Sequence, residues 1–128
     1  MTDRMELLSP GGSFAAASAA LHYGADAVYV GLQRFSARAA ASNLTEAELA
    51  ALVAHAHGLV PRRAVYLALN TLVTDGQLPA VLDALETASE AGVDAVILQD
   101  LALCRLVREH FPSLCLHAST QMGVHNLA

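Results

Sequence analysis

Side chains that can form hydrogen bonds follow each of five short apolar runs in this 128-residue sequence. His117 stands at the end of the last run, where it is the plausible general base of the fifth predicted strand. Arg38 lies in the polar stretch after the second run and could clamp a carboxylate or a phosphate. We predict these two as catalytic residues. We predict substrate contacts from five neutral residues with amide or hydroxyl groups: Ser9, Asn70, Gln99, Ser119 and Gln121.

Each of these residues also has a purely structural interpretation. His117 could be a satisfied core histidine, and Arg38 could lie in a solvated loop. The stretch SPGGS at 9–13 could bind an anion through its N–H groups, or it could simply form a tight turn. Asp100 is expected to cap a helix.

No metal or disulfide site is predicted. His117 and His125 lack a visible third ligand, and the His-Glu-x-x-His motif is absent. The two cysteines, Cys104 and Cys115, lack a metal-ligand spacing. Cys104 is expected to be a small core residue.

The composition excludes several classes of protein. Hydrophobic residues make up 55%, charged residues 15%, and the mean hydropathy is +0.43, which excludes a disordered chain. A net charge of −5 argues against a free-standing nucleic-acid-binding module. The sequence shows neither an uninterrupted apolar run of membrane-spanning length nor a signal peptide, so we predict a cytoplasmic protein.

Apolar runs alternate with longer Ala- and Leu-rich stretches, which is typical of βα units. Ser13 and Thr45 are suitable N-caps, and Glu48 completes a capping box with Thr45. Gly24 and Gly92 fit helix C-termini. These signals predict strands at 5–8, 27–30, 64–69, 94–98 and 114–117. They predict helices at 14–23, 46–57, 78–91 and 101–110.

Two five-residue segments resemble each other. GADAV at 24–28 recurs as GVDAV at 92–96, each time between a predicted helix and the strand that follows it. The spacing of two βα units indicates a repeating architecture, although such turns also recur in unrelated α/β proteins.

The alternation predicts a parallel sheet, in either an open doubly wound fold or a (βα)₈ barrel. Only residues 118–128 follow the fifth predicted strand, too few for a covering helix. We therefore predict an α/β fold that is the first half of a (βα)₈ TIM-type barrel. Ligands bind at the carboxyl ends of the strands in both folds. The first and fifth strands would be exposed edges, which predicts a homodimer or other assembly.

Five motifs occur in order along the chain: ELLSP at 6–10, YGADAVY at 23–29, LNT at 69–71, VDAVILQD at 93–100 and HASTQM at 117–122. Together they resemble the N-terminal region of the collagenase-like peptidase family U32. FSAR at 35–38 and ASN at 41–43 are most similar to the members that hydroxylate ribosomal RNA. The resemblance implies that residues 1–128 are the N-terminal half of a barrel catalytic domain.

The resemblance also implies a range of activities. The family was named for proteolysis, whereas better-understood members hydroxylate tRNA, rRNA or ubiquinone precursors without oxygen. Several hold an iron–sulfur cluster on cysteines in the second half of the barrel, so no cofactor is expected in this chain. TDGQL at 74–78 departs from the family's acidic loop. We expect an RNA or small-molecule hydroxylase; the alternatives are a true protease and a non-catalytic binding or assembly module.

Overall fold

Five short strands form one parallel sheet in the computed structural model, which describes residues 4–33 and 43–123. The described strands are β1 Leu8–Pro10, β2 Ala27–Val30, β3 Ala64–Leu69, β4 Ala95–Leu98 and β5 Leu116–Ala118. The helices between them are α1 Phe14–His22, α2 Glu46–His57, α3 Leu78–Ala91 and α4 Leu101–His110. Two 3₁₀ segments are η1 Asp75–Gln77 and η2 Thr120–Met122. The predicted α/β class is confirmed.

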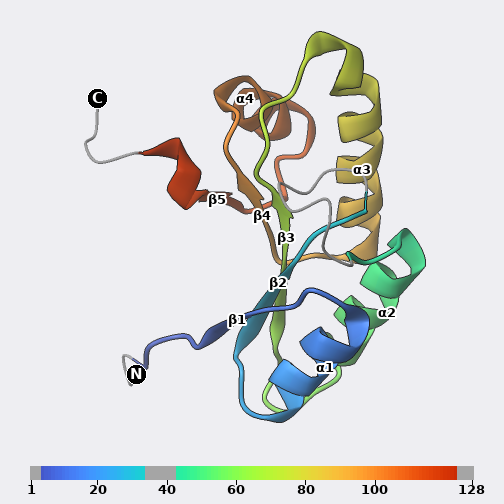
Figure 1. Ribbon diagram of the computed structural model, residues 1–128, viewed down its shortest axis with the longest axis vertical. Coiled ribbons are helices and arrows are strands. Elements are labelled where there is room, and N and C mark those ends of the chain that lie inside the picture. The colour runs from blue at the N-terminus through green and yellow to red at the C-terminus, as the bar shows by residue number, and fades with distance from the viewer. Residues whose placement is uncertain (1–3, 34–42, 124–128) are drawn as a thin grey trace.

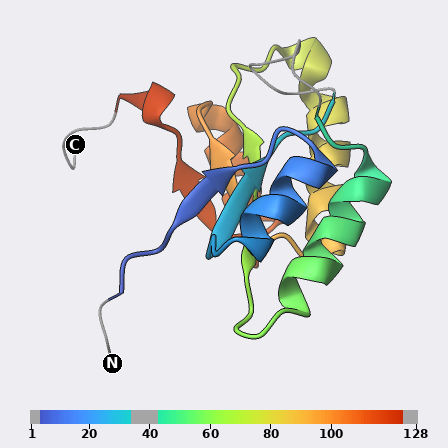
Figure 2. The same ribbon diagram turned by 60° about the horizontal axis from the view of Figure 1, so that its bottom comes forward.

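The strands pair in chain order across the sheet, from β1 to β5. Right-handed crossovers between successive neighbours pass over the same face, whereas a doubly wound sheet reverses its strand order and is covered on both faces. Figure 1 shows α1, α2 and α3 along one side of the sheet, and the turned view in Figure 2 agrees. An open parallel sheet with one helical face corresponds to part of a (βα)₈ barrel.

The predicted bounds are exact for β2, β3, α2, α3 and α4. The first strand begins at Leu8 rather than Met5, because the polar groups of Leu7 bond to the turn before β2. Its N–H donates to Asp26, and its carbonyl accepts from the N–H groups of Asp26 and Ala27. The fifth strand begins at Leu116 rather than Leu114, because a turn bond joins the N–H of Leu114 to the carbonyl of Phe111.

The predicted caps account for where the helices begin and end. Ser13 accepts a hydrogen bond from the N–H of Ala16. Thr45 and Glu48 form the reciprocal capping box of α2. Gly24 and Gly92 have φ values of 113° and 83°, which glycine adopts without a steric penalty.

The two faces of the sheet carry different side chains because successive strand residues point to opposite sides. Val28, Val65 and Val96 belong to the main core on the helical side. The opposite face, called here the open face, carries a separate cluster with alanines and a tyrosine at its centre. Its members are Ala27, Tyr66 and Ala95, with Tyr29, Ala64 and Ile97 packed against them.

The predicted repeat has a structural role at the amino ends of the strands. Asp26 accepts a hydrogen bond from the N–H of Leu7, just before β1, and pairs with Arg4. Asp94 accepts one from the N–H of Val65 on β3, at 2.8 Å. Each aspartate therefore ties its own strand to the preceding one in the sheet.

Asp94 also anchors a charged cluster. His57 Nε2 lies 2.9 Å from one carboxylate oxygen, and an Arg62 guanidinium nitrogen lies 2.8 Å from the other. Burial alone would raise the pKa of Asp94, but the hydrogen bonds from His57, the Val65 N–H and Arg62 outweigh it and hold the pKa below its ordinary value. The carboxylate therefore stays charged at neutral pH.

Within residues 4–33 and 43–123, no helix combines the length and hydropathy needed to span a bilayer.

Candidate active site

A cavity of about 610 Å³ lies on the open face toward the carboxyl ends of the strands. Its walls come from all five strands or the segments that follow them, as the parallel topology requires. Its polar lining side chains are Tyr29, Asn43, Asn70, His117, Ser119, Thr120 and Gln121. We call it the carboxyl-end cavity.

His117 reaches the cavity because of its place on β5. It pairs in register with Ile97 on β4, and Ile97 pairs in register with Ala68 on β3. In-register residues of neighbouring parallel strands point to the same face, and all three line the cavity. His117 is half-buried there, within reach of a ligand.

The segment after β5 lines one side of the cavity. The N–H of Ser119 donates to the carbonyl of Leu98, which extends the pairing of β5 with β4. The buried Ser119 hydroxyl then accepts from the N–H of Gln121 and caps η2. This turn brings Gln121 to the cavity, so Ser119 both lines the site and holds its wall.

The structure brings together four of the predicted site residues: Asn70, His117, Ser119 and Gln121 all line the cavity. Ser9 and Gln99 are not among the lining residues. Arg38 lies outside the described residues. The roles of all seven remain predictions.

Strand alternation explains why Ser9 is missing from the lining. Ser9 pairs with Val28, whose side chain belongs to the helix-side core, whereas its neighbours Leu8 and Pro10 line the cavity. Gln99 is half-buried at the turn where β4 leads into α4. The next residue, Asp100, accepts hydrogen bonds from Ala102 and Leu103 and caps α4 as predicted.

Gly11 favours the structural interpretation of the turn after β1. A Cβ atom there would lie 2.7 Å from Ala17 Cβ and 3.0 Å from Val30 Cγ1. The glycine is therefore needed for α1 to pack closely against β2.

The described lining of the cavity contains no Asp, Glu, Lys or Arg side chain, and His117 is its one basic group. Tyr29 provides an aromatic surface. Asn43 Nδ2 is buried and, in the part of the chain that the structure describes, has no hydrogen-bond partner. An unpaired buried amide is costly, so a ligand acceptor placed beside it would be favoured.

His117 has a neighbour that the sequence did not reveal. Its ring meets the Tyr66 ring in a T-shaped contact, with centroids 4.8 Å apart and an interplanar angle of 71°. The Tyr66 hydroxyl donates to the Glu6 carboxylate, 2.8 Å and 2.9 Å from its two oxygens. The available signal was the alternation of Tyr66 with Val65 and Leu67, which places a polar-tipped ring on the open face.

The described residues do not provide the ligands that an iron–sulfur cluster needs. Among the described residues, no group of three or more His, Cys, Asp or Glu side chains could hold a metal ion. Cys104 is half-buried on α4, where burial raises the pKa of its thiol, and Cys115 is exposed just before β5.

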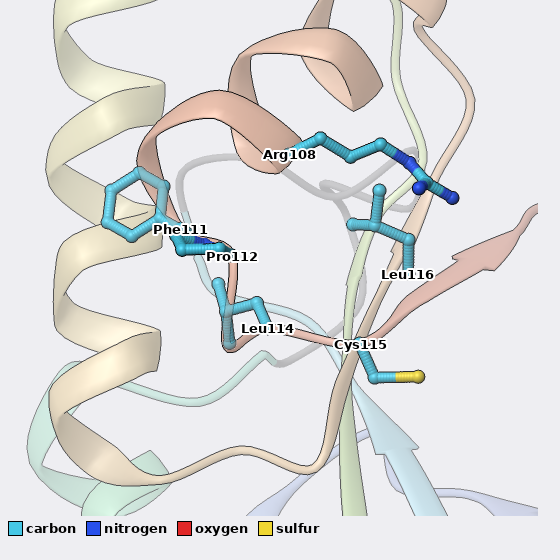
Figure 3. A pocket seen from close by; sticks show the side chains of 6 residues that line it. All are labelled: Arg108, Phe111, Pro112, Leu114, Cys115 and Leu116. Atoms are coloured by element: carbon cyan, nitrogen blue, oxygen red, sulfur yellow. The ribbon is translucent and has the colours of Figure 1, made fainter.

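A second cavity, of about 460 Å³, lies where α4 leads into β5 (Figure 3). It contains no predicted site residue. Its lining consists of Arg108, Phe111, Pro112, Leu114, Cys115 and Leu116.

Known proteins resemble the chain over nearly its whole length. It is 42% identical over 122 residues to an uncharacterized protease of Methanocaldococcus jannaschii, covering 95% of this chain and 29% of that protein. It is 37% identical over 123 residues to the tRNA hydroxylation protein P of Escherichia coli, covering 96% of this chain and 27% of that protein. It is 38% identical over 124 residues to a 23S rRNA 5-hydroxycytidine synthase of Escherichia coli, covering 97% of this chain and 18% of that protein.

The chain thus spans less than a third of the length of these relatives. No solved structure matches it significantly. The model of Peptidase family U32 matches residues 12–128, which include all of the described helices and strands β2 to β5. Because this match covers more than half of the sequence, the chain belongs to Peptidase family U32.

Proposed function

We propose that this chain forms the N-terminal, substrate-binding part of a cytoplasmic enzyme that hydroxylates a base of tRNA or rRNA without molecular oxygen. Two of the relatives described above are named for tRNA and rRNA hydroxylation. In this proposal the rest of a (βα)₈ barrel, with any iron–sulfur cluster, belongs to a longer protein.

The observation that carries the proposal is the described lining of the carboxyl-end cavity, which offers amide and hydroxyl groups and contains no Asp, Glu, Lys or Arg side chain. A nucleobase is planar and neutral, and its edges carry both donors and acceptors. Amide side chains such as Asn70 and Gln121 offer both as well. Proteins recognise splayed-out bases by stacking on aromatic rings and by hydrogen bonds to base edges, and Tyr29 provides such a ring.

Within this site His117 is the residue that would accept or donate a proton. Its imidazole has one nitrogen that can accept a proton and one that can donate, and it lies in the same lining as Asn70 and Ser119. We assign it to proton transfer with the bound base. Asn70, Ser119 and Gln121 orient the base. Ser9 and Gln99 remain predicted contacts to other parts of the substrate, and Arg38 remains a predicted catalytic residue.

The test is a nucleoside analysis of RNA from cells in which the gene for this sequence is deleted. Mass spectrometry should show the loss of a hydroxylated pyrimidine nucleoside from tRNA or rRNA. The intact gene should restore it, and a gene with His117→Ala should not. Unchanged nucleoside profiles after deletion would refute RNA hydroxylation.

Proteolysis is the second candidate, favoured by the presence of Ser119 and His117 in one cavity and by the name of one relative. The hydroxyl of Ser119 accepts a hydrogen bond from the N–H of Gln121, which gives it a structural role. Digestion of casein or gelatin by the purified full-length protein, abolished by Ser119→Ala, would establish a protease. If neither the nucleoside analysis nor the digestion assay detects an activity, the non-catalytic binding or assembly alternative is favoured.

We also retain the prediction that a homodimer or other assembly covers the edges at β1 and β5. Light scattering at increasing protein concentration tests it, and a constant monomer mass would count against it.

A further inference from the structure

We propose that Tyr66 is a positioning residue that orients the imidazole of His117 in the carboxyl-end cavity, with Glu6 holding Tyr66 in place. The proposal rests on the assignment of His117 to the substrate site. It adds two residues from separate segments, β3 and the chain before β1, that are absent from the cavity lining.

The geometry of the sheet explains how residues on β3 and β5 can touch. Strand β4 runs between them, and neighbouring strands are about 4.8 Å apart. Tyr66 pairs with Ala95 on β4, and His117 pairs with the next open-face residue, Ile97. Because Ala95 is small, the Tyr66 ring can extend across β4 and meet His117 from the amino-end side.

The contact restricts the orientation of the imidazole. Edge-to-face pairs are favoured at centroid distances of 4.5–7 Å, and this pair lies at 4.8 Å with the rings 71° apart. Tyr66 is only 8% exposed, so its ring has little room to move. His117 is half-buried and is therefore free to meet a ligand on its other side.

Glu6 fixes the far end of Tyr66. Its carboxylate accepts the Tyr66 hydroxyl at hydrogen-bond distance from both oxygens. Burial, followed by the bond to Glu6, raises the pKa of Tyr66 to about 12, so the hydroxyl keeps its proton and remains a donor at neutral pH. A chain of contacts thus runs from the segment before β1 through β3 to β5.

The experiment follows the His117 ring by NMR in the purified chain. Tyr66→Leu removes the ring. Tyr66→Phe keeps the ring and removes the hydroxyl that donates to Glu6, whereas Glu6→Gln keeps the ring and weakens this hydrogen bond by removing the charge of its acceptor. Tyr23→Leu is the matched control, because Tyr23 is 85% exposed at the end of α1. We expect Tyr66→Leu to shift the His117 ring-proton resonances most. Tyr66→Phe and Glu6→Gln should shift them less and in a common direction, and Tyr23→Leu should not shift them.

The nucleoside assay is the second readout. Tyr66→Leu should reduce hydroxylation by up to about tenfold, and Tyr66→Phe should restore most of it. If His117 resonances do not respond to any of the three variants, the positioning role is refuted whatever the enzyme does. If Tyr66→Leu fails to fold, Tyr66→Phe and Glu6→Gln decide by the same criterion. If the resonances move in Tyr66→Phe or Glu6→Gln, which keep the aromatic ring, but RNA hydroxylation does not depend on the gene, the proposed function fails and the positioning role stands.

Discussion

The two ends of the sheet use polar side chains in opposite ways. At the amino ends of the strands, Asp26 and Asp94 are charged and are bonded to backbone N–H groups and to basic side chains. At the carboxyl ends, the described polar side chains of the cavity lining are neutral amides and hydroxyls around one histidine. The first arrangement satisfies its own groups, and the second leaves hydrogen-bonding capacity for a ligand.

The direction of the strands accounts for part of this difference. A carboxylate placed where a strand begins can accept the N–H of the neighbouring strand, as Asp94 does with Val65. Such bonds to a charged acceptor are stronger than neutral ones. Stability and binding are therefore separated along the strand axis, and substitutions at the two ends should affect different measurements.

The largest expected effect is on activity, from His117→Ala. Loss of a general acid or base typically lowers the rate about 100-fold or more. The free energy of unfolding should fall by about 1 kcal/mol or less, because mainly the contact with Tyr66 is lost. The nucleoside assay and urea unfolding measure the two quantities, with His110→Ala on the exposed end of α4 as control. An equal loss of folding and activity would indicate a core histidine.

The next effect is on stability, from Asp94→Ala. The substitution leaves the Val65 N–H, His57 and Arg62 without their shared acceptor, which should cost about 2 kcal/mol of unfolding free energy. Urea unfolding measures it. Glu90→Ala removes a carboxylate from an exposed position on α3 and should change stability little. Equal effects of the two variants would show that Asp94 contributes only its charge.

The pH dependence of the unfolding free energy should reflect the aspartates at the amino ends of the strands. The pKa values of Asp26 and Asp94 are lowered in the folded protein: for Asp26 mainly by the hydrogen bond from the N–H of Leu7, and for Asp94 by the hydrogen bonds that outweigh its burial. Their contribution is therefore complete above the unfolded-state pKa of about 4 and is lost as the pH falls through the folded-state values. Urea unfolding from about pH 6 downward should show this loss, with a shallower slope in Asp94→Ala. An unchanged slope in that variant would refute the assignment to Asp94.

The smallest expected effect is on hydroxylation activity, in a comparison of two glutamines at the carboxyl ends of the strands. Gln121 lines the cavity and Gln99 does not, although the sequence suggested both. Gln121→Ala should lower hydroxylation about threefold to tenfold, the range for one hydrogen bond, with no loss of stability. Gln99→Ala should have a smaller effect on the same assay. The reverse order would place the substrate outside the observed cavity.

Local signals were sufficient for most of the fold. Capping residues, helix-ending glycines and β-branched runs act within a few residues, and they predicted α2, α3 and α4 with their starts and ends. The edge strands β1 and β5 were misplaced by two or three residues. Their limits depend on hydrogen bonds to other segments, such as those of Leu7 with Asp26 and Ala27, which no local pattern contains.

The sequence by itself determined the alternation of strands and helices, and it indicated polar residues near the carboxyl end of every strand. Only the tertiary structure decided which of them share a cavity, because one position along a strand moves a side chain to the opposite face, as Ser9 shows. Only the tertiary structure placed Tyr66 against His117, because the contact depends on strand order and on a small residue, Ala95, on the strand between them.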